Sequence, residues 1–302
     1  MAEILMERKA QLSFREKLRI MGTFIAREAK MWTRFRVSFF MDIAAIIAQA
    51  SIFLFIGITF IKDSPEMVQY GGDYVTYLIL GLIFLRFMDS SLTSPYQALS
   101  DFYWSSRLEA ILLSPCSINL MITSGTVWRY IKTLLDMMIY LLLGSLFGMH
   151  LGMPTSLCLF LLVFILGIVS VLGFGLISAS MFMLINAKGW NDPIKWIVRT
   201  LQGLVCGIYY PIAILPNWLQ KIGLCLPQTY AVDAVRRLFL RISPSTITLS
   251  PQEWFSFTPL GALGADILIL CFFLLFLLPL GFLSFKLGLK KAKSDGCLSR
   301  WT

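Results

Sequence analysis

Charged residues are scarce in this sequence. Asp, Glu, Lys and Arg make up only 14% of the 302 residues, whereas 57% are apolar or aromatic and the mean hydropathy is +0.75. A soluble domain is normally about a quarter charged, and this amount of charge is too small to coat a water-soluble globule of 34.2 kDa. The composition therefore excludes a water-soluble enzyme, a nucleic-acid-binding module and a disordered chain.

Residue types that bind metals or nucleotides are also few. His150 is the only histidine, and no two of the six cysteines stand at CxxC spacing. This argues against a zinc site, a disulfide framework and a histidine-based catalytic triad. No GxxxxGK[ST] phosphate loop occurs either. We therefore expect no metal and no cofactor on this chain, and if ATP drives it, another polypeptide must bind that ATP.

What the sequence has instead is long apolar runs. Several exceed the roughly 18 residues that cross the hydrocarbon core as a helix, so the predicted fold is an all-α polytopic membrane protein. A cytoplasmic N-terminus at 1–36, a membrane domain at 37–285 and a basic tail at 286–302 form its three parts. The six expected transmembrane helices lie at about 37–61, from 74 onward, and at 118–147, 155–186, 194–214 and 258–285.

An interfacial amphipathic helix is expected before the first span. Ser13 and Glu16 fit a capping box, after which apolar residues recur on one face and Lys and Arg occupy much of the rest. Such a helix suits the membrane interface, with its cations near anionic lipid headgroups. Basic residues gather before the first span and in the tail, so we place both termini in the cytoplasm of a multi-pass cell (inner) membrane protein. Residues 215–256 oppose this assignment, because they are net positive and yet lie outside.

Five charged residues fall inside the second and third spans. Such residues are expensive in hydrocarbon and normally face the bundle interior or a cavity. The spacing allows Arg86 to pair with Asp89 and Lys132 to pair with Asp136. They either line a transport pathway or pair structurally near the cytoplasmic interface. The five are Arg86, Asp89, Arg129, Lys132 and Asp136.

The cytoplasmic loop 98–117 is too apolar for an idle turn. Ser106 with Glu109 can cap a short helix that Pro115 would stop. An apolar helix of this kind suits docking into a partner's groove. The alternative is a helix folded back on its own bundle.

Two stretches resemble the type-2 ABC exporter permeases. Residues 107–119 (Arg-Leu-Glu-Ala-Ile-Leu-Leu-Ser-Pro-Cys-Ser-Ile-Asn) are similar to the loop between the second and third spans of that family, although Ser106 stands where the family often has glycine. Residues 210–220 (Tyr-Pro-Ile-Ala-Ile-Leu-Pro-Asn-Trp-Leu-Gln) and 226–236 (Leu-Pro-Gln-Thr-Tyr-Ala-Val-Asp-Ala-Val-Arg) resemble its Pro-rich segment after the fifth span. With the interfacial helix, six spans and basic tail, the resemblance covers nearly the whole chain.

The resemblance implies a permease subunit of an ATP-driven exporter that moves a lipid, polysaccharide or drug-like substrate out of the cytoplasm or inner leaflet. Two copies, as a homodimer among membrane lipids, would pair with two ABC ATPase subunits, which would hold ATP and Mg. The chain would not itself be an enzyme, and residues 207–256 would form re-entrant outer helices. Tyr209 and Tyr210 join the five intramembrane charges as candidates for the pathway or gate. The loop would be a coupling helix whose contacts with the ATPase are Phe102, Tyr103, Arg107, Leu108, Glu109 and Leu112.

Two other functions stay open. An ion-coupled secondary transporter would need ion-coordinating groups near mid-membrane, for which Asp42, Asp89 and Asp266 are available. An intramembrane enzyme would need a nucleophile with a nearby base, but Ser178 and His150 lie at opposite ends of their region. Co-isolation with an ATPase subunit would separate the permease from both alternatives.

Overall fold

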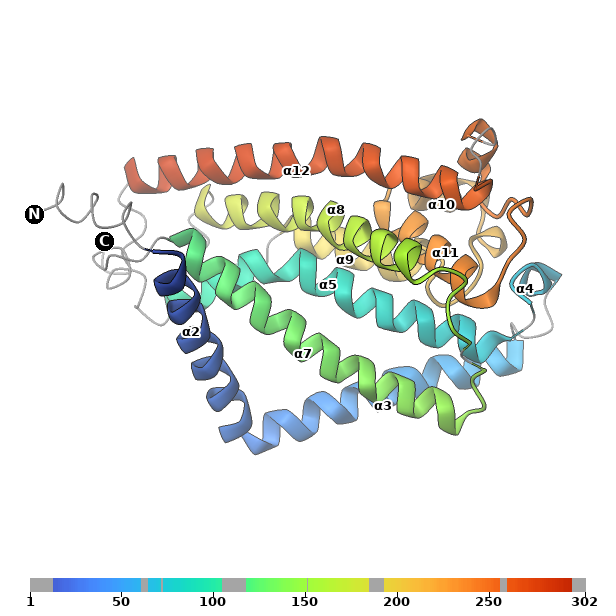
Figure 1. Cartoon of the computed structure of the whole chain (residues 1–302), viewed down its shortest axis with the longest axis horizontal. Helices are drawn as coiled ribbons and strands as arrows, with labels where there is room; N and C mark the ends of the chain where they lie inside the picture. The colour runs from blue at the N-terminus through green and yellow to red at the C-terminus, as the bar shows by residue number, and fades with distance from the viewer. Residues whose placement is uncertain are drawn as a thin grey trace, which may run out of the picture.

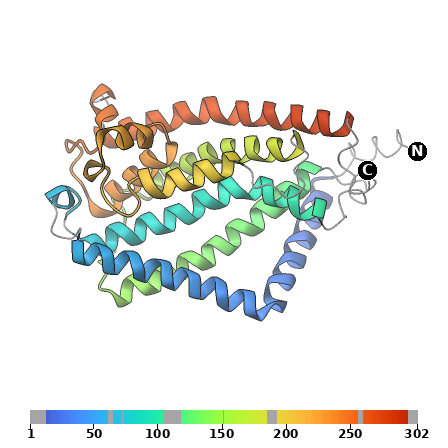
Figure 2. The ribbon, with the colours of Figure 1, turned by 180° about the vertical axis from the view of Figure 1, so that it is seen from behind.

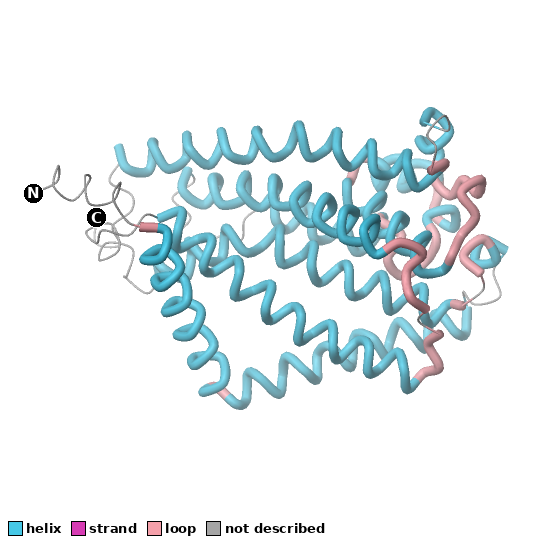
Figure 3. The backbone as a smooth tube through the Cα atoms, viewed as in Figure 1, coloured by secondary structure: helices cyan, strands magenta, loops and turns pink. Residues whose placement is uncertain are grey.

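The structure is a computed structural model that describes residues 13–60, 65–71, 73–104, 118–150, 152–184, 193–255 and 260–294. Over these ranges the chain forms helices and connecting loops, without strands (Figures 1 and 3). The long helices are α2 (Phe14–Arg34), α3 (Arg36–Phe60), α5 (Tyr74–Trp104), α7 (Ile118–Leu146), α8 (Leu157–Leu184) and α12 (Ala262–Ser294). The shorter elements are α4 (Pro65–Val68), α9 (Pro193–Val205), η1 (Ile212–Ile214), α10 (Asn217–Leu224), α11 (Pro227–Leu240) and η2 (Ser250–Phe255).

Helix α5 is the centre of the bundle. It packs against α7 on one side and α8 on the other, and α12 covers the far side of α8 (Figure 1). Most of its side chains are buried, whereas fewer than a third are buried in the most apolar part of the other three membrane-length helices. Because α5 is enclosed by neighbours, its polar residues meet protein groups rather than lipid.

Within the described ranges, four helices are long and apolar enough to cross a membrane. For these ranges, this confirms the expected helical fold, with apolar helices that are compatible with a membrane protein. The four segments are Phe39–Thr59, Tyr74–Asp101, Leu157–Met183 and Ala262–Ala292. Helix α7 has a similar length of 29 residues but carries three charges, so it does not join this set.

The fifth expected span differs from a continuous helix over 194–214. Helix α9 has 13 residues, or about 20 Å at 1.5 Å per residue, which is shorter than a hydrocarbon core of about 30 Å. The chain then turns at Gly207, whose φ of +69° suits glycine. Pro211, which lacks a backbone N–H, precedes η1. These two residues end the helix inside the apolar run.

Helix α2 has the predicted capping box and amphipathic character. The backbone N–H of Ser13 donates to the Glu16 carboxylate at 2.8 Å. No residue of α2 is buried, and its apolar residues Phe14, Leu18 and Met31 are exposed. The helix runs steeply across the end of the bundle (Figure 1). This is the geometry that an interfacial helix requires, and its place in the membrane stays a prediction.

The two ends of the bundle carry different elements. Helix α2 and the C-terminal end of α12 lie at one end, whereas α4, α10 and α11 lie at the other (Figures 1 and 2). The lysines 286, 290 and 291 on α12 therefore lie at the same end as the basic helix α2. Under the positive-inside rule we expect this end to face the cytoplasm, and that orientation stays a prediction.

This orientation predicts which sites a membrane-impermeant maleimide reaches. In a cysteine-free background, Cys225 restored alone should be labelled on intact cells, because it is exposed at the end of α10. A Ser294→Cys variant, exposed at the end of α12, should react only after permeabilisation. Cys206, which is buried, serves as the unreactive control. The reverse labelling pattern would overturn the orientation.

Candidate functional site

Polar side chains from three helices meet midway along two of the helices that are long enough to cross a membrane. Gln49 is the central residue of the segment Phe39–Thr59, and Arg86 and Asp89 flank the centre of Tyr74–Asp101. They border a cleft of about 120 Å³ on the face where α9 lies beside α5 (Figure 2). The lining residues are Gln49, Leu85, Arg86, Asp89, Arg199, Gln202, Gly203 and Tyr209.

Arg86 holds three helices together at the cleft. Its Nη2 donates to Gln49 Oε1 at 3.0 Å on α3, and its Nε donates to the Tyr140 hydroxyl at 3.1 Å on α7. Both acceptors are neutral oxygens. Asp136 acts on Arg86 electrostatically but forms no ion pair with it in the part of the chain that the structure describes. The expected Arg86–Asp89 pair is therefore wrong, because Arg86 reaches away from α9.

Asp89 faces α9 instead. Its Oδ1 lies 3.1 Å from Arg199 Nε and 3.5 Å from Gln202 Nε2. The Asp89 side chain is 19% exposed and that of Arg199 is 56% exposed. Asp89 thus anchors a guanidinium whose outer part is accessible from the cleft.

The two tyrosines after α9, Tyr209 and Tyr210, have different roles. The Tyr209 hydroxyl accepts from Gln49 Nε2 at 3.2 Å, and its ring stacks on Phe53 at 3.6 Å. The Tyr210 hydroxyl donates to the Leu204 carbonyl at 2.6 Å. Tyr209 therefore lines the cleft, whereas Tyr210 fixes the turn after α9.

The charges on α7 lie away from this cleft. Lys132 pairs with Asp42 of α3 at 2.5 Å, so the expected pairing with Asp136 is wrong. Arg129 lies 3.3 Å from Asp101 at the end of α5. In both ion pairs the partner lies on a neighbouring helix rather than on the next turn of α7. These ion pairs tie α7 to α3 and α5.

The residues assigned to the coupling helix have no described contacts. Phe102 and Tyr103 belong to the last turn of α5, and nothing is described of their side chains. Arg107, Leu108, Glu109 and Leu112 lie outside the described residues. The coupling role of the loop stays a prediction from the sequence.

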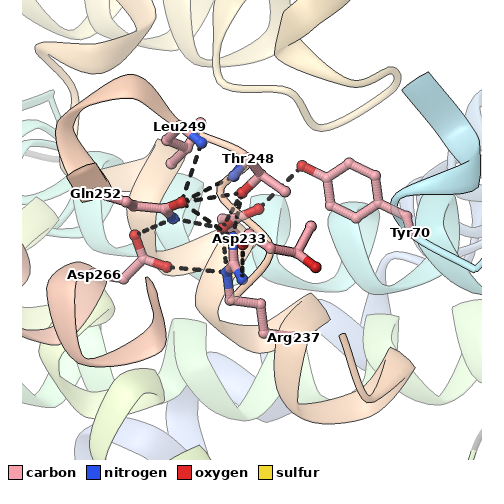
Figure 4. Close-up of polar contacts among 8 residues, drawn as sticks. Tyr70, Asp233, Arg237, Thr248, Leu249, Gln252 and Asp266 are labelled. Atoms are coloured by element: carbon pink, nitrogen blue, oxygen red, sulfur yellow. Dashed lines mark hydrogen bonds and ion pairs between the residues drawn. The ribbon is translucent and has the colours of Figure 1, made fainter. Parts of the chain in front are cut away.

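A buried charged network lies at the end of the bundle opposite α2 (Figure 4). Asp233 and Arg237 of α11 form an ion pair at 2.7 Å, and both are almost fully buried. Gln252 of η2 donates to Asp233 at 2.9 Å and to Asp266 of α12 at 2.8 Å. Tyr70 donates to Asp233 at 3.1 Å. The network therefore joins α11, η2, α12 and the turn after α4.

Two groups of this network that lie outside the membrane-length helices, Asp233 and Tyr70, have shifted pKa values. Burial alone would raise the pKa of Asp233, but the Arg237 guanidinium and hydrogen bonds from Thr248, Arg237 and Gln252 lower it below the ordinary value. Burial raises the pKa of Tyr70 well above its ordinary value. The Tyr70 phenol therefore stays protonated and donates to the Asp233 carboxylate.

Arg236 of α11 lies at the same end of the bundle and contacts α5 and the turn after α9. Its guanidinium is buried and donates to the carbonyls of Tyr77, Gly207 and Ile208 at 3.2, 2.6 and 2.7 Å. It also lies 3.4 Å above the Tyr77 ring. A cation–π contact of this kind adds to the hydrogen bonds. Arg236 thus fixes α11 to α5 and to the turn after α9.

Sequence reasoning missed the three other polar residues of the cleft, which are Gln49, Arg199 and Gln202. Gln49 is polar within an apolar run, which is a signal that the sequence does carry. Lys195, Arg199 and Gln202 stand at i, i+4 and i+7 on one face of α9, a pattern that marks a polar face. This pattern could have indicated a polar site on α9, but it could not have identified Asp89 of α5 as the partner of Arg199.

Neither a metal-binding group nor a related protein helps to identify the function of this site. Among the described residues no group of three or more His, Cys, Asp or Glu is arranged to hold a metal ion. No protein-family model matches the sequence, and no curated protein matches it significantly.

Proposed function

We propose that the chain is a membrane transport subunit whose translocation path runs past the mid-membrane cleft. The observation that carries this proposal is the placement of Arg86, Asp89 and Gln49 at the centres of two membrane-crossing helices. Charges at this depth are costly unless they serve a pathway or a buried pair. Here Arg199 is more than half exposed beside the cleft, which favours a pathway over a sealed structural pair.

The architecture supports passage at this point. Helix α9 ends after 13 residues and the chain turns at Gly207. Irregular backbone at membrane depth is tolerated where it borders protein or a water-filled cavity. A broken helix beside a polar cleft is a common arrangement for a binding site in transporters.

We further propose that the chain works as the permease of a type-2 ABC exporter, as a homodimer with two ATPase subunits. The resemblance of residues 107–119 and 210–236 carries this part. Helix α2 across one end and the short helices α10 and α11 at the other agree with an interfacial helix and an outer re-entrant segment. ATP and Mg would bind the partner ATPase, and closure of the ATPases would act through the loop 98–117.

An ion-coupled transporter is less well supported. Its three candidate acidic residues each have a close partner. Asp42 pairs with Lys132, Asp89 pairs with Arg199, and Asp266 lies 3.6 Å from Arg237. A coordinating group for a transported cation is better supplied by free oxygen atoms than by carboxylates held in ion pairs.

The test of this proposal is the coupling loop. We expect Glu109→Arg and Leu108→Asp to leave the chain inserted and dimeric while they weaken ATPase association and stop transport. The reason is that a reversed charge or a buried carboxylate disrupts a desolvated docking surface. The measurement is affinity purification of the full chain from its native membrane, followed by quantification of the bound ATPase and its hydrolysis rate.

The matched control is Lys221→Gln, an exposed position on α10 at the opposite end of the bundle. This variant should retain the wild-type amount of ATPase. Absence of any ATPase with the wild-type chain, or full coupling in both loop variants, would refute the ABC assignment.

A further inference from the structure

The cleft presents hydrogen-bonding groups that the protein itself leaves unused. Arg199 uses Nε on Asp89, and its other guanidinium nitrogens have no partner within the described part of the chain. Tyr209 accepts from Gln49, so its own hydroxyl proton is available to donate. Gln202 lines the cleft but is only 1% exposed, and its Oε1 is buried with no hydrogen-bond partner among the described residues. The Gln202 side chain must turn toward the cleft for this oxygen to meet a ligand. The cleft thus offers several donors and one orphaned acceptor.

Charge at the lining favours an anion. Two guanidiniums and one carboxylate border the cleft. The carboxylate of Asp89 is taken by Arg199, whereas Arg86 donates only to neutral oxygens. Asp136 acts on Arg86 from a distance and does not line the cleft. Arg is the side chain best suited to bind phosphate, because its planar fork matches the phosphate oxygens.

A buried acceptor without a partner is costly. The Gln202 Oε1 needs a donor, which a bare phosphate dianion or a choline headgroup does not supply. A hydroxyl next to the phosphate supplies it. An ammonium group would also supply a donor, but it would add a positive charge beside Arg86 and Arg199. The lining therefore favours a phosphate that carries a neighbouring hydroxyl group.

We propose that the cleft binds the phosphate of an amphiphile whose headgroup also carries a hydroxyl. Arg199 and Tyr209 donate to the phosphate, and the headgroup hydroxyl donates to Gln202 Oε1. This deepens the proposed function, on which it rests, by naming the substrate class of the same cleft.

The dimensions agree with an amphiphile. A volume of about 120 Å³ holds a headgroup but not acyl chains. Ile52 and Ile56, three and seven residues after Gln49 on α3, are exposed. The acyl chains of the ligand would lie along them.

Binding of short-chain lipids to the purified full-length chain in a neutral detergent tests this proposal. The probe is dihexanoyl phosphatidylglycerol. The matched probes are dihexanoyl phosphatidylmethanol, which has the same charge without the hydroxyl, and dihexanoyl phosphatidylcholine. We expect phosphatidylglycerol to bind tightest. We expect Arg199→Gln to weaken its binding at least tenfold, because the variant removes the exposed guanidinium.

Two further arms keep the test decisive. Gln202→Leu should abolish the preference for phosphatidylglycerol over phosphatidylmethanol while the binding of phosphatidylmethanol is retained. Lys221→Gln removes one positive charge far from the cleft and should bind like the wild type. Glycerol 1-phosphate has the same headgroup without acyl chains. Tight binding of this probe would show that the ligand is a free phosphate ester, and weak binding would show that it is a lipid.

Equal affinity for phosphatidylcholine and phosphatidylglycerol, or unchanged binding in Arg199→Gln, would overturn the proposal. These measurements need no ATPase. A chain that binds phosphatidylglycerol through Arg199 but recruits no ATPase would keep this site and lose the ABC assignment. A chain that recruits ATPase but does not discriminate among the lipids would keep the ABC assignment and lose this site.

Discussion

Replacing Arg236 with methionine is expected to destabilise the protein by about 1–3 kcal/mol, because it leaves a buried carbonyl without its hydrogen-bond donor. The guanidinium donates to three backbone carbonyls on two parts of the chain, Tyr77 on one side and Gly207 and Ile208 on the other. Methionine fills much of the same volume but donates no hydrogen bond. The Ile208 carbonyl would then lose the donor at 2.7 Å, whereas Gly207 keeps the Tyr77 hydroxyl at 2.8 Å.

Unfolding in mixed detergent–SDS micelles measures this loss, with the thermal melting temperature as a second readout. The control is Arg241→Met, which removes the same charge from the exposed end of α11 and should leave stability close to that of the wild type. Gly81→Ala offers an independent approach to the same contact, because an added Cβ would lie 2.4 Å from Arg236 Nη2 and 2.6 Å from the Ile208 carbonyl oxygen. If Arg236→Met melts like Arg241→Met, Arg236 does not join these elements.

Asp233→Asn is expected to destabilise the protein much more than Asp266→Asn, although both remove one buried carboxylate. Asp233 accepts hydrogen bonds from Tyr70, Arg237, Thr248 and Gln252. An amide at this position turns one acceptor into a donor and leaves the Arg237 guanidinium without its nearest carboxylate. Breaking one side of such a buried pair costs about 3–5 kcal/mol.

Asp266 occupies a different place in the same network (Figure 4). Its Oδ1 accepts from Gln252 at 2.8 Å, but its Oδ2 has no hydrogen-bond partner in the described structure and lies 3.6 Å from Arg237 Nε. Asparagine keeps the acceptor for Gln252 and removes a negative charge that repels Asp233. We therefore expect Asp266→Asn to cost little. Equal losses in the two variants would contradict this division of roles.

The pH dependence of unfolding gives a second readout for Asp233. Its pKa is lowered in the folded state, since burial is outweighed by Arg237 and the hydrogen bonds. The carboxylate therefore contributes stability that is complete above its unfolded pKa of about 4 and is lost as the pH falls through the folded value. Asp233→Asn should flatten this acid limb relative to the wild type. Lys221→Gln should leave it unchanged.

Much of the fold could be read from the sequence, because membrane helices follow from local composition. The run over 155–186 has no charged residue, and it forms α8 over Leu157–Leu184. The capping box at Ser13 likewise depends on residues three apart. Hydrophobic run length and short-range hydrogen bonds are properties of neighbours in the chain, and the sequence lists those neighbours directly.

The charge partners could not be read in the same way. Lys132 and Asp136 are one turn apart, yet Lys132 pairs with Asp42 on another helix. Arg86 likewise passes over Asp89 to reach Gln49 and Tyr140. The rotation of each helix about its axis decides these pairings. That rotation is set by packing against several neighbours at once.

The sequence by itself determined that this protein is helical and apolar enough for a membrane, because too few charged residues are available to coat a globule in water. Only the tertiary structure decided that Gln49, Arg86, Asp89, Arg199, Gln202 and Tyr209 form one cleft. Gln49 and Tyr209 are 160 residues apart in the chain and 3.2 Å apart at their hydrogen-bonded atoms. A contact of that separation depends on how α3, α5 and α9 pack together, and no local pattern encodes it.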